Sequence, residues 1–215
     1  MKPVFFFLLL ALFAIGTFAQ LPVFPEGVYL TREQMQNLTP AYKLKLRVIR
    51  RTSGDVFMVG GNDYKLVSDN DSLSGKFIKT KIFAYVTGDS VFLNNLPFTE
   101  QPWYSRCLTR GNFLAFKTAV PDKNSATYGV LFGAIGGAIA AGTAAQDRTL
   151  FVLSLRTGNA KHLTKAYLME RLTNYPDLFD RFNSEKEKDS EETILKYLNL
   201  LNQVVSMKTL PATVK

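Results

Sequence analysis

The sequence predicts an α+β fold, an antiparallel β-sheet domain with an inserted glycine-rich helix and a C-terminal helical section. Three observations carry this prediction. Apolar and polar residues alternate with a period of two at several places between residues 27 and 118. Residues 126–145 carry no charged side chain and are rich in glycine and alanine. After residue 164, apolar residues recur at the spacing that is typical of amphipathic helices docked on a core.

The first 19 residues are predicted to be a cleavable signal peptide. Lys2 gives a short basic start, and residues 4–15 form an apolar run that is too short to span a bilayer. Small residues at Thr17 and Ala19 place the cleavage site before Gln20. A retained N-terminal anchor helix is the alternative. We therefore expect residues 20–215 to form a single exported domain of the periplasm or outer envelope, with membrane association left open.

Residues 27–118 are predicted to be mainly β. A short strand over residues 27–31 leads into a capping box formed by Thr31 and Gln34, so a short helix should follow and stop before Pro40. From residue 41 the alternation returns and predicts a half-buried strand with a basic outer face.

Three further strand signals complete this part of the chain. Residues 56–59 are apolar and follow a turn at residues 52–55, so they are predicted to be a strand. Residues 82–93, with Gly88 at the turn, form the plainest hairpin signal. Residues 103–118, with a turn at Gly111, predict a second hairpin.

The uncharged segment 126–145 is predicted to be a glycine-zipper-like apolar helix. On a helical wheel its bulky residues gather on one side and its small residues on the other. Its five glycines cost roughly 5 kcal/mol relative to alanine, which close packing against a neighbour would have to recover. The residues expected to make this helix-packing or membrane contact are Gly129, Gly133, Gly136, Gly137 and Ala141.

Three interpretations of segment 126–145 stay open. The helix could pack against its own domain or between subunits, it could insert into a membrane, or the segment could form an irregular glycine loop. Its length, at about 1.5 Å per residue, approaches the thickness of a bilayer core. A single membrane span, however, would separate residues 146–215 from the sheet that their strand should join.

The remaining chain is predicted to contain strands over residues 149–163 and helices over residues 164–207. One helix should begin near Thr164, and a second should have Pro176 in its first turn. Asp189 and Glu192 resemble a cap for the third helix.

The charge balance indicates which partners the protein can have. The formal net charge is +8, and its densest part includes Lys43, Lys45 and Arg47, which could contact an anionic surface. A solvated strand face is the alternative. Nucleic acid is not expected as a partner of an exported chain, whereas self-association, an envelope protein partner and membrane contact are.

No pattern of catalytic, metal or cofactor chemistry is present in the sequence. Cys107 and His162 are the only residues of their types, so no intramolecular disulfide can form, and a Cys–His pair would need them to meet in space. Asp69, Asn70 and Asp71 lack the spacing of a calcium loop and are expected to be a solvated turn. The glycines fit neither phosphate-binding motif. We therefore expect no enzyme, no metal and no cofactor.

Several short motifs together resemble a group of known proteins. They are an FAQ export site, GVYLT at residues 27–31, GAIGGAIAAG at 133–142, RTG at 156–158, a Leu-Pro-Leu-Phe pattern at 172–182 and YLxxLN at 197–202. This combination is similar to small exported proteins of the Bacteroidota that belong to domain-of-unknown-function families. The resemblance implies a bacterial envelope setting and transfers no catalytic residue.

The leading functional hypothesis is a non-enzymatic envelope protein that acts by binding or assembly through its glycine-rich helix. The alternative is a carrier of a small apolar molecule or lipid in a cavity of the β-sheet.

Overall fold

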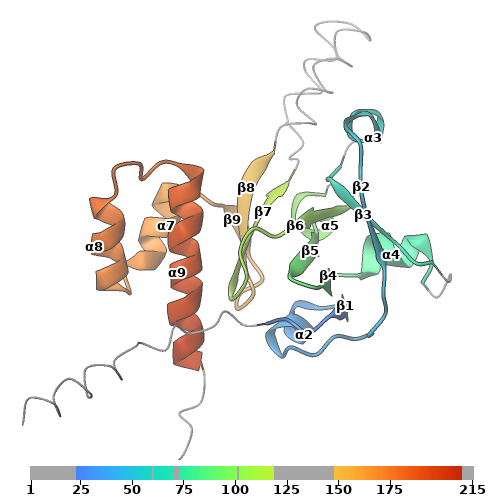
Figure 1. Cartoon of the computed structure of the whole chain (residues 1–215), viewed down its shortest axis with the longest axis horizontal. Coiled ribbons are helices and arrows are strands. Elements are labelled where there is room, and N and C mark those ends of the chain that lie inside the picture. Colours follow the sequence, from blue (N-terminus) through green and yellow to red (C-terminus); the bar gives the residue numbers. More distant parts are fainter. Residues whose placement is uncertain (1–22, 60, 70–72, 101, 119–147, 210–215) are drawn as a thin grey trace, which may run out of the picture.

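The structure is a computed structural model that describes residues 23–59, 61–69, 73–100, 102–118 and 148–209. The predicted signal peptide and the predicted glycine-rich helix, with Gly129, Gly133, Gly136, Gly137 and Ala141, lie outside the described residues. The α+β prediction is confirmed, because two antiparallel sheets are followed by a helical C-terminal section (Figure 1).

The larger sheet has six strands in the order β1-β4-β5-β6-β3-β2. The strands are β1 (Gly27–Tyr29), β2 (Arg47–Arg50), β3 (Tyr64–Val67), β4 (Ala84–Thr87), β5 (Ser90–Asn94) and β6 (Tyr104–Arg106). The hairpin of β4 and β5 pairs Ala84 with Leu93 and turns at Gly88, whose φ of 50° suits glycine. The strand β2 lies at one edge of this sheet.

The smaller sheet has three strands in the order β7-β8-β9. They are β7 (Phe113–Thr118), β8 (Thr149–Ser154) and β9 (Ala160–His162). Thr118, at the end of β7, pairs with Thr149, at the start of β8. The described residues that flank the segment containing residues 126–145 therefore lie side by side, at one end of β7 and β8.

Three apolar cores lie between the layers of the described fold. Alternate residues of one strand enter different cores, as when Ala84 and Val86 pack between the two sheets while Tyr85 faces the opposite side of the larger sheet. The helix α4 (Gly75–Lys81) covers that opposite side through the buried Ile78. The third core lies between the smaller sheet and the C-terminal helices.

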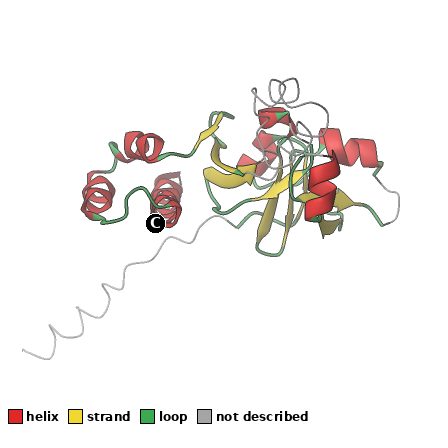
Figure 2. Cartoon of the chain, turned by 90° about the horizontal axis from the view of Figure 1, so that it is seen from above, coloured by secondary structure: helices red, strands yellow, loops and turns green. Residues whose placement is uncertain are grey.

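The remaining helices are short except at the C-terminus. They are α2 (Arg32–Gln36), α3 (Ser53–Val59), α5 (Leu96–Thr99), α7 (Lys165–Leu172), α8 (Pro176–Ser184) and α9 (Glu191–Thr209). Figure 2 shows α7, α8 and α9 grouped on one side of the molecule, away from the other helices. Asn202 fastens α9 to β7, since its side chain accepts a hydrogen bond from the Phe113 N–H and donates one to the Phe113 carbonyl, both at 2.8 Å.

Several predicted local signals are confirmed. Thr31 and Gln34 form the expected capping box at the start of α2. The Thr164 hydroxyl accepts a hydrogen bond from the Tyr167 N–H and caps α7. Pro176 occupies the first turn of α8. Among the described residues, no helix has both the length and the apolar character that crossing a membrane requires.

Two predicted strands differ from the structure. The strand expected from residue 41 begins only at Arg47, and before it Tyr42 makes a single bridge to Val28. Residues 56–59 belong to α3 and not to a strand, because Thr52 and Asp55 exchange hydrogen bonds that start a helix at this point.

The hairpin expected at residues 103–118 is also only partly right. Its two strands, β6 and β7, belong to different sheets and are joined by the bridge between Cys107 and Phe116. The cap of α9 is Ser190, whose hydroxyl accepts a hydrogen bond from the Thr193 N–H, whereas Asp189 forms an ion pair with Lys165.

Candidate ligand-binding cleft

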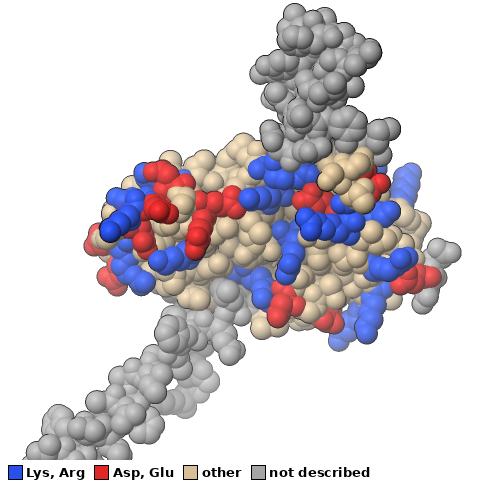
Figure 3. All heavy atoms as spheres, turned by 45° about the horizontal axis from the view of Figure 1, so that its top comes forward, with Lys and Arg blue, Asp and Glu red and all other residues tan. Residues whose placement is uncertain are grey.

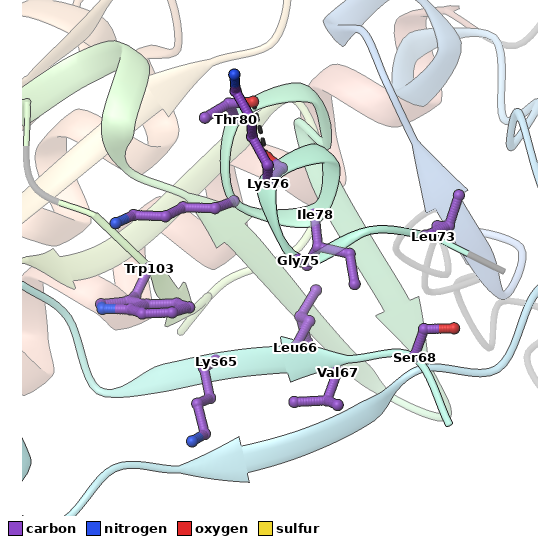
Figure 4. Close-up of a pocket in the computed structure, with 11 residues that line it drawn as sticks. Lys65, Leu66, Val67, Ser68, Leu73, Gly75, Lys76, Ile78, Thr80 and Trp103 are labelled. Carbon is purple, nitrogen blue, oxygen red and sulfur yellow. Dashed lines mark hydrogen bonds between the residues drawn. The ribbon is translucent and has the colours of Figure 1, made fainter. Parts of the chain in front are cut away.

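An open cleft of about 530 Å³ lies between α4 and β3, on the outer face of the larger sheet (Figure 4). The side chains of Leu66 on β3 and Ile78 on α4 point toward one another across it, and Trp103 stands at one end. The other residues of the lining are Lys65, Val67, Ser68, Leu73, Gly75, Lys76, Lys79 and Thr80. The floor of the cleft is therefore apolar, and its polar groups lie toward the rim.

The short helix α4 is held in place by capping and by bonds from distant strands. The Ser74 hydroxyl accepts a hydrogen bond from the Phe77 N–H at the start of the helix. The buried Asn94 side chain donates to the carbonyls of Lys79 (3.0 Å) and Ile82 (2.8 Å) at its end. The Tyr104 hydroxyl donates to the Ile78 carbonyl, and burial raises the pKa of Tyr104 far above its usual value. One wall of the cleft is thus fixed by the sheet itself.

Trp103 is the only tryptophan of the chain, and its backbone is held in an unusual conformation. Its φ of 76° lies in the left-handed region, which costs a bulky residue about 1–3 kcal/mol. The neighbouring backbone fixes it, since the Asn95 N–H donates to the Trp103 carbonyl and the Asn62 N–H donates to the Pro102 carbonyl. Among the described residues, the buried Trp103 indole N–H has no hydrogen-bond partner. Such strain and such an orphan donor are typical of binding sites.

Two cations flank the Trp103 ring. The Lys79 ammonium lies 5.2 Å from the ring centroid, and the Arg51 guanidinium lies 5.5 Å from it. Arg51 is only 9% exposed, and it donates to the carbonyls of Asn62 (2.7 Å) and Asp55 (2.9 Å). Burial lowers the pKa of Arg51, chiefly through the loss of hydration. Positive charge is therefore concentrated at the aromatic end of the cleft.

The lining suits binding better than acid–base chemistry. None of the described residues that line the cleft is a carboxylic acid, a histidine or a cysteine. Apolar walls with a few convergent polar groups are what small-molecule sites offer. Among the described residues, no group of three or more His, Cys, Asp and Glu side chains is placed to hold a metal ion.

The Cys–His pair considered from the sequence does not form. Cys107 and His162 lie on one row across neighbouring strands, with Phe116 and Phe151 between them. Three strand spacings therefore separate Cys107 from His162, a distance of roughly 14 Å. Burial raises the pKa of the Cys107 thiol strongly. His162 instead lies against the Phe151 ring, with 4.3 Å between the ring centroids.

The model of a family of unknown function, DUF6563, matches residues 27–205. The chain belongs to this family. The resemblance to a domain-of-unknown-function family is thereby confirmed. No curated protein and no solved structure matches the DUF6563 chain.

The basic residues predicted to contact an anionic surface lie away from the cleft of the DUF6563 domain. Lys43 and Lys45 are exposed in the segment that precedes β2, and Arg47 is exposed on β2 and pairs with Asp69 at 3.0 Å. Charged residues at an edge strand also discourage edge-to-edge aggregation. Contact with an anionic surface stays a prediction. Asn70 and Asp71 lie outside the described residues.

The sequence alone did not reveal the cleft of this DUF6563 domain. The sequence pattern singles out neither Trp103 as a binding residue nor the helix α4. One signal was available, because Ser74 precedes a seven-residue stretch with Ile78 at its centre and two lysines in its last turn, which is typical of a capped helix. The proximity of Arg51, Lys79 and Trp103 depends on the order of the strands, which no local pattern specifies.

Proposed function

We propose that this chain is an exported, non-enzymatic binding protein of the bacterial cell envelope, and that its cleft between α4 and β3 takes a small amphipathic molecule with an acidic head. This is a version of the carrier hypothesis, with the ligand on the outer face of the sheet. The export part rests on the predicted signal peptide and the resemblance. The binding part rests on one observation, the apolar cleft that ends at Trp103 and Lys79.

The lining supports this ligand class on physical grounds. Burying an alkyl chain against Leu66, Leu73 and Ile78 gains roughly 25 cal/mol per Å² of apolar area. The Lys79 ammonium provides a cation where the apolar floor ends. A carboxylate at that point gains attraction, whereas a cationic head would meet the ammonium groups of the lysines that line the cleft, Lys65, Lys76 and Lys79.

A titration monitored by the fluorescence of Trp103 tests this ligand class. Dodecanoate, below its micelle concentration, should change the Trp103 emission saturably, and dodecyltrimethylammonium of equal chain length should bind at least several-fold more weakly. Lys79→Gln should weaken dodecanoate binding by about threefold to tenfold, as expected for a partly exposed charge contact. Lys81→Gln is the matched control, because Lys81 belongs to the same helix and does not line the cleft.

Two results of this titration would overturn the proposal. One is equal binding of the anionic and cationic probes, since the cation at Trp103 would then have no role. The other is the absence of any saturable change in emission with dodecanoate.

Assembly through segment 126–145 is a second candidate function, and one described feature favours a contact on one side of a membrane over a single crossing. Thr118 pairs with Thr149, so the chain leaves and re-enters the smaller sheet at one place. A single crossing would put these paired residues on opposite sides of a bilayer. Gly133→Leu and Gly137→Leu should change folding, oligomeric state or membrane fractionation. Unchanged melting and fractionation would contradict this role.

A further inference from the structure

A second pocket, of about 250 Å³, lies near the end of the smaller sheet where β7 ends at Thr118 and β8 starts at Thr149. We name it the arginine pocket, and its lining is Arg50, Arg51, Ser53, Val56, Asp63 and Arg148. Figure 3 views the molecule with this end forward and shows Lys and Arg side chains gathered around a smaller number of acidic ones. The pocket is distinct from the cleft, although Arg51 borders the first and contacts Trp103 in the second.

The arginine pocket has an excess of positive charge at short range. Three guanidinium groups line it against the single carboxylate of Asp63. Asp63 Oδ1 accepts from Arg148 at 2.6 Å and 3.1 Å, so its charge is directed to that side chain. The nearby Asp55 carboxylate accepts from the Thr52 backbone and hydroxyl. Among the described residues of this region, and with Asp55 counted, three cations and two anions leave one net positive charge.

This excess is partly desolvated. The Arg148 side chain is 14% exposed and Arg51 is 9% exposed. Electrostatic interactions are stronger in such surroundings than in water, so like charges brought together here repel more strongly. Burial is the main cause of the lowered pKa of Arg51, the Asp55 charge opposes it, and the nearby Arg148 charge lowers the pKa further. A bound anion would relieve this repulsion.

The backbone framework around the pocket is rigid. The Arg51 N–H donates to the Asp63 carbonyl at 2.7 Å, and the Arg51 side chain donates to the Asn62 carbonyl. Arg148 immediately precedes β8, whose first residue pairs with Thr118. Arg50 is the exposed member at the end of β2. Two guanidinium groups are thus fixed in place, and a third stands at the opening.

We propose that the arginine pocket binds a phosphate-class oxyanion, with Arg50 and Arg148 as its charged walls and the Ser53 hydroxyl as a neutral donor. Guanidinium groups present planar pairs of N–H donors that suit tetrahedral oxyanions. The phosphate group could belong to a small soluble ester or to a lipid head group. The chemistry of recognition is the same in both cases. This inference stands apart from the amphiphile cleft and does not depend on it.

Calorimetric titration with inorganic phosphate tests the site, with sodium chloride at equal ionic strength as the reference. Wild-type protein should bind phosphate, and Arg50→Gln should weaken that binding about tenfold or more, as the loss of a charge-assisted hydrogen bond predicts. Arg47→Gln is the matched control, because it removes the same charge from the same strand outside the pocket. Its affinity for phosphate should equal that of wild type within about twofold.

Thermal melting distinguishes a loss of phosphate binding from a loss of folding in Arg50→Gln. Arg50 is exposed, so Arg50→Gln should melt like wild type without phosphate and should lose the rise in Tm that phosphate gives the wild type. If phosphate binds no better than chloride, or if Arg50→Gln and Arg47→Gln weaken binding equally, the proposed site is refuted. Neither result bears on dodecanoate binding to the cleft.

Vesicles identify the source of the phosphate group. Neutral phosphatidylcholine vesicles are compared with phosphatidylcholine vesicles that contain about 20% phosphatidic acid. Binding to the second kind that millimolar phosphate displaces and Arg50→Gln abolishes supports a lipid head group. Phosphate binding without vesicle binding supports a soluble phosphate ester.

Discussion

Replacing Asn202 with alanine should loosen the attachment of the C-terminal helices to the smaller sheet. The fully buried Asn202 side chain makes two hydrogen bonds of 2.8 Å to the backbone of Phe113, at the start of β7. Its removal leaves one N–H and one carbonyl of Phe113 without these partners. Each unsatisfied group costs about 1–3 kcal/mol, and because Phe113, which carries both groups, is half-buried, we expect about 2–4 kcal/mol in total.

Thermal and urea unfolding of residues 20–215 measure this cost. A loss of about 2–4 kcal/mol should lower the Tm by roughly 4–16 °C for a chain of this size. Gln203→Ala is the control on the next position of α9, where the side chain is half-buried, and its effect should stay within about 0.5 kcal/mol. If Asn202→Ala melted within about 1 °C of wild type, the view that this side chain fastens α9 to β7 would be refuted.

Two further predictions concern single titratable groups. Cys107 is half-buried, and burial raises the pKa of its thiol, so the thiol should react with a thiol reagent more slowly in the native protein than in the urea-unfolded chain at the same pH, and equal rates would contradict the raised pKa. Hydrogen bonds from Lys196 and then from Tyr197 lower the pKa of Glu185 in the folded protein. Its contribution to stability is therefore present above the unfolded-state pKa near 4.5 and is lost as the pH falls through the lower folded-state pKa. The free energy of unfolding of Glu185→Gln should lie below that of wild type at neutral pH, and the two values should converge in acid. A constant difference at all pH values would show that the carboxylate charge is not involved.

Local signals predicted those elements that depend on neighbouring residues. The capping box of Thr31 and Gln34, the cap at Thr164 and the turn at Gly88 all act within a few residues, and the structure has each of them. The strand predicted at residues 56–59 was wrong, because a run of four apolar residues after a turn fits a short strand and a short helix equally well. The reciprocal hydrogen bonds of Thr52 and Asp55 instead start a helix there.

The cleft could not be predicted because distant residues create it. The helix α4 has seven residues, too few for a helical period to stand out, and it is fixed by Asn94 and Tyr104 from other strands. The strand β6 pairs with β3 only through Tyr64 and Tyr104, yet this pairing brings Trp103 to the end of the cleft. The arginine pocket likewise joins residues near position 50 with Arg148.

A substitution that blocks the cleft between α4 and β3 tests most directly whether this cleft is a binding site. Gly75 lines the cleft, and a Cβ atom built on it meets no atom within 4 Å, so Gly75→Phe places a ring in the opening without a clash at the backbone. Gly54→Phe is the control, because Gly54 is an exposed glycine of another short helix, and the nearest atom to an added Cβ lies at 3.8 Å. The measurement is the affinity for dodecanoate from Trp103 emission. We expect Gly75→Phe to lose binding at least tenfold while Gly54→Phe keeps it, and equal affinities in the two variants would contradict the account.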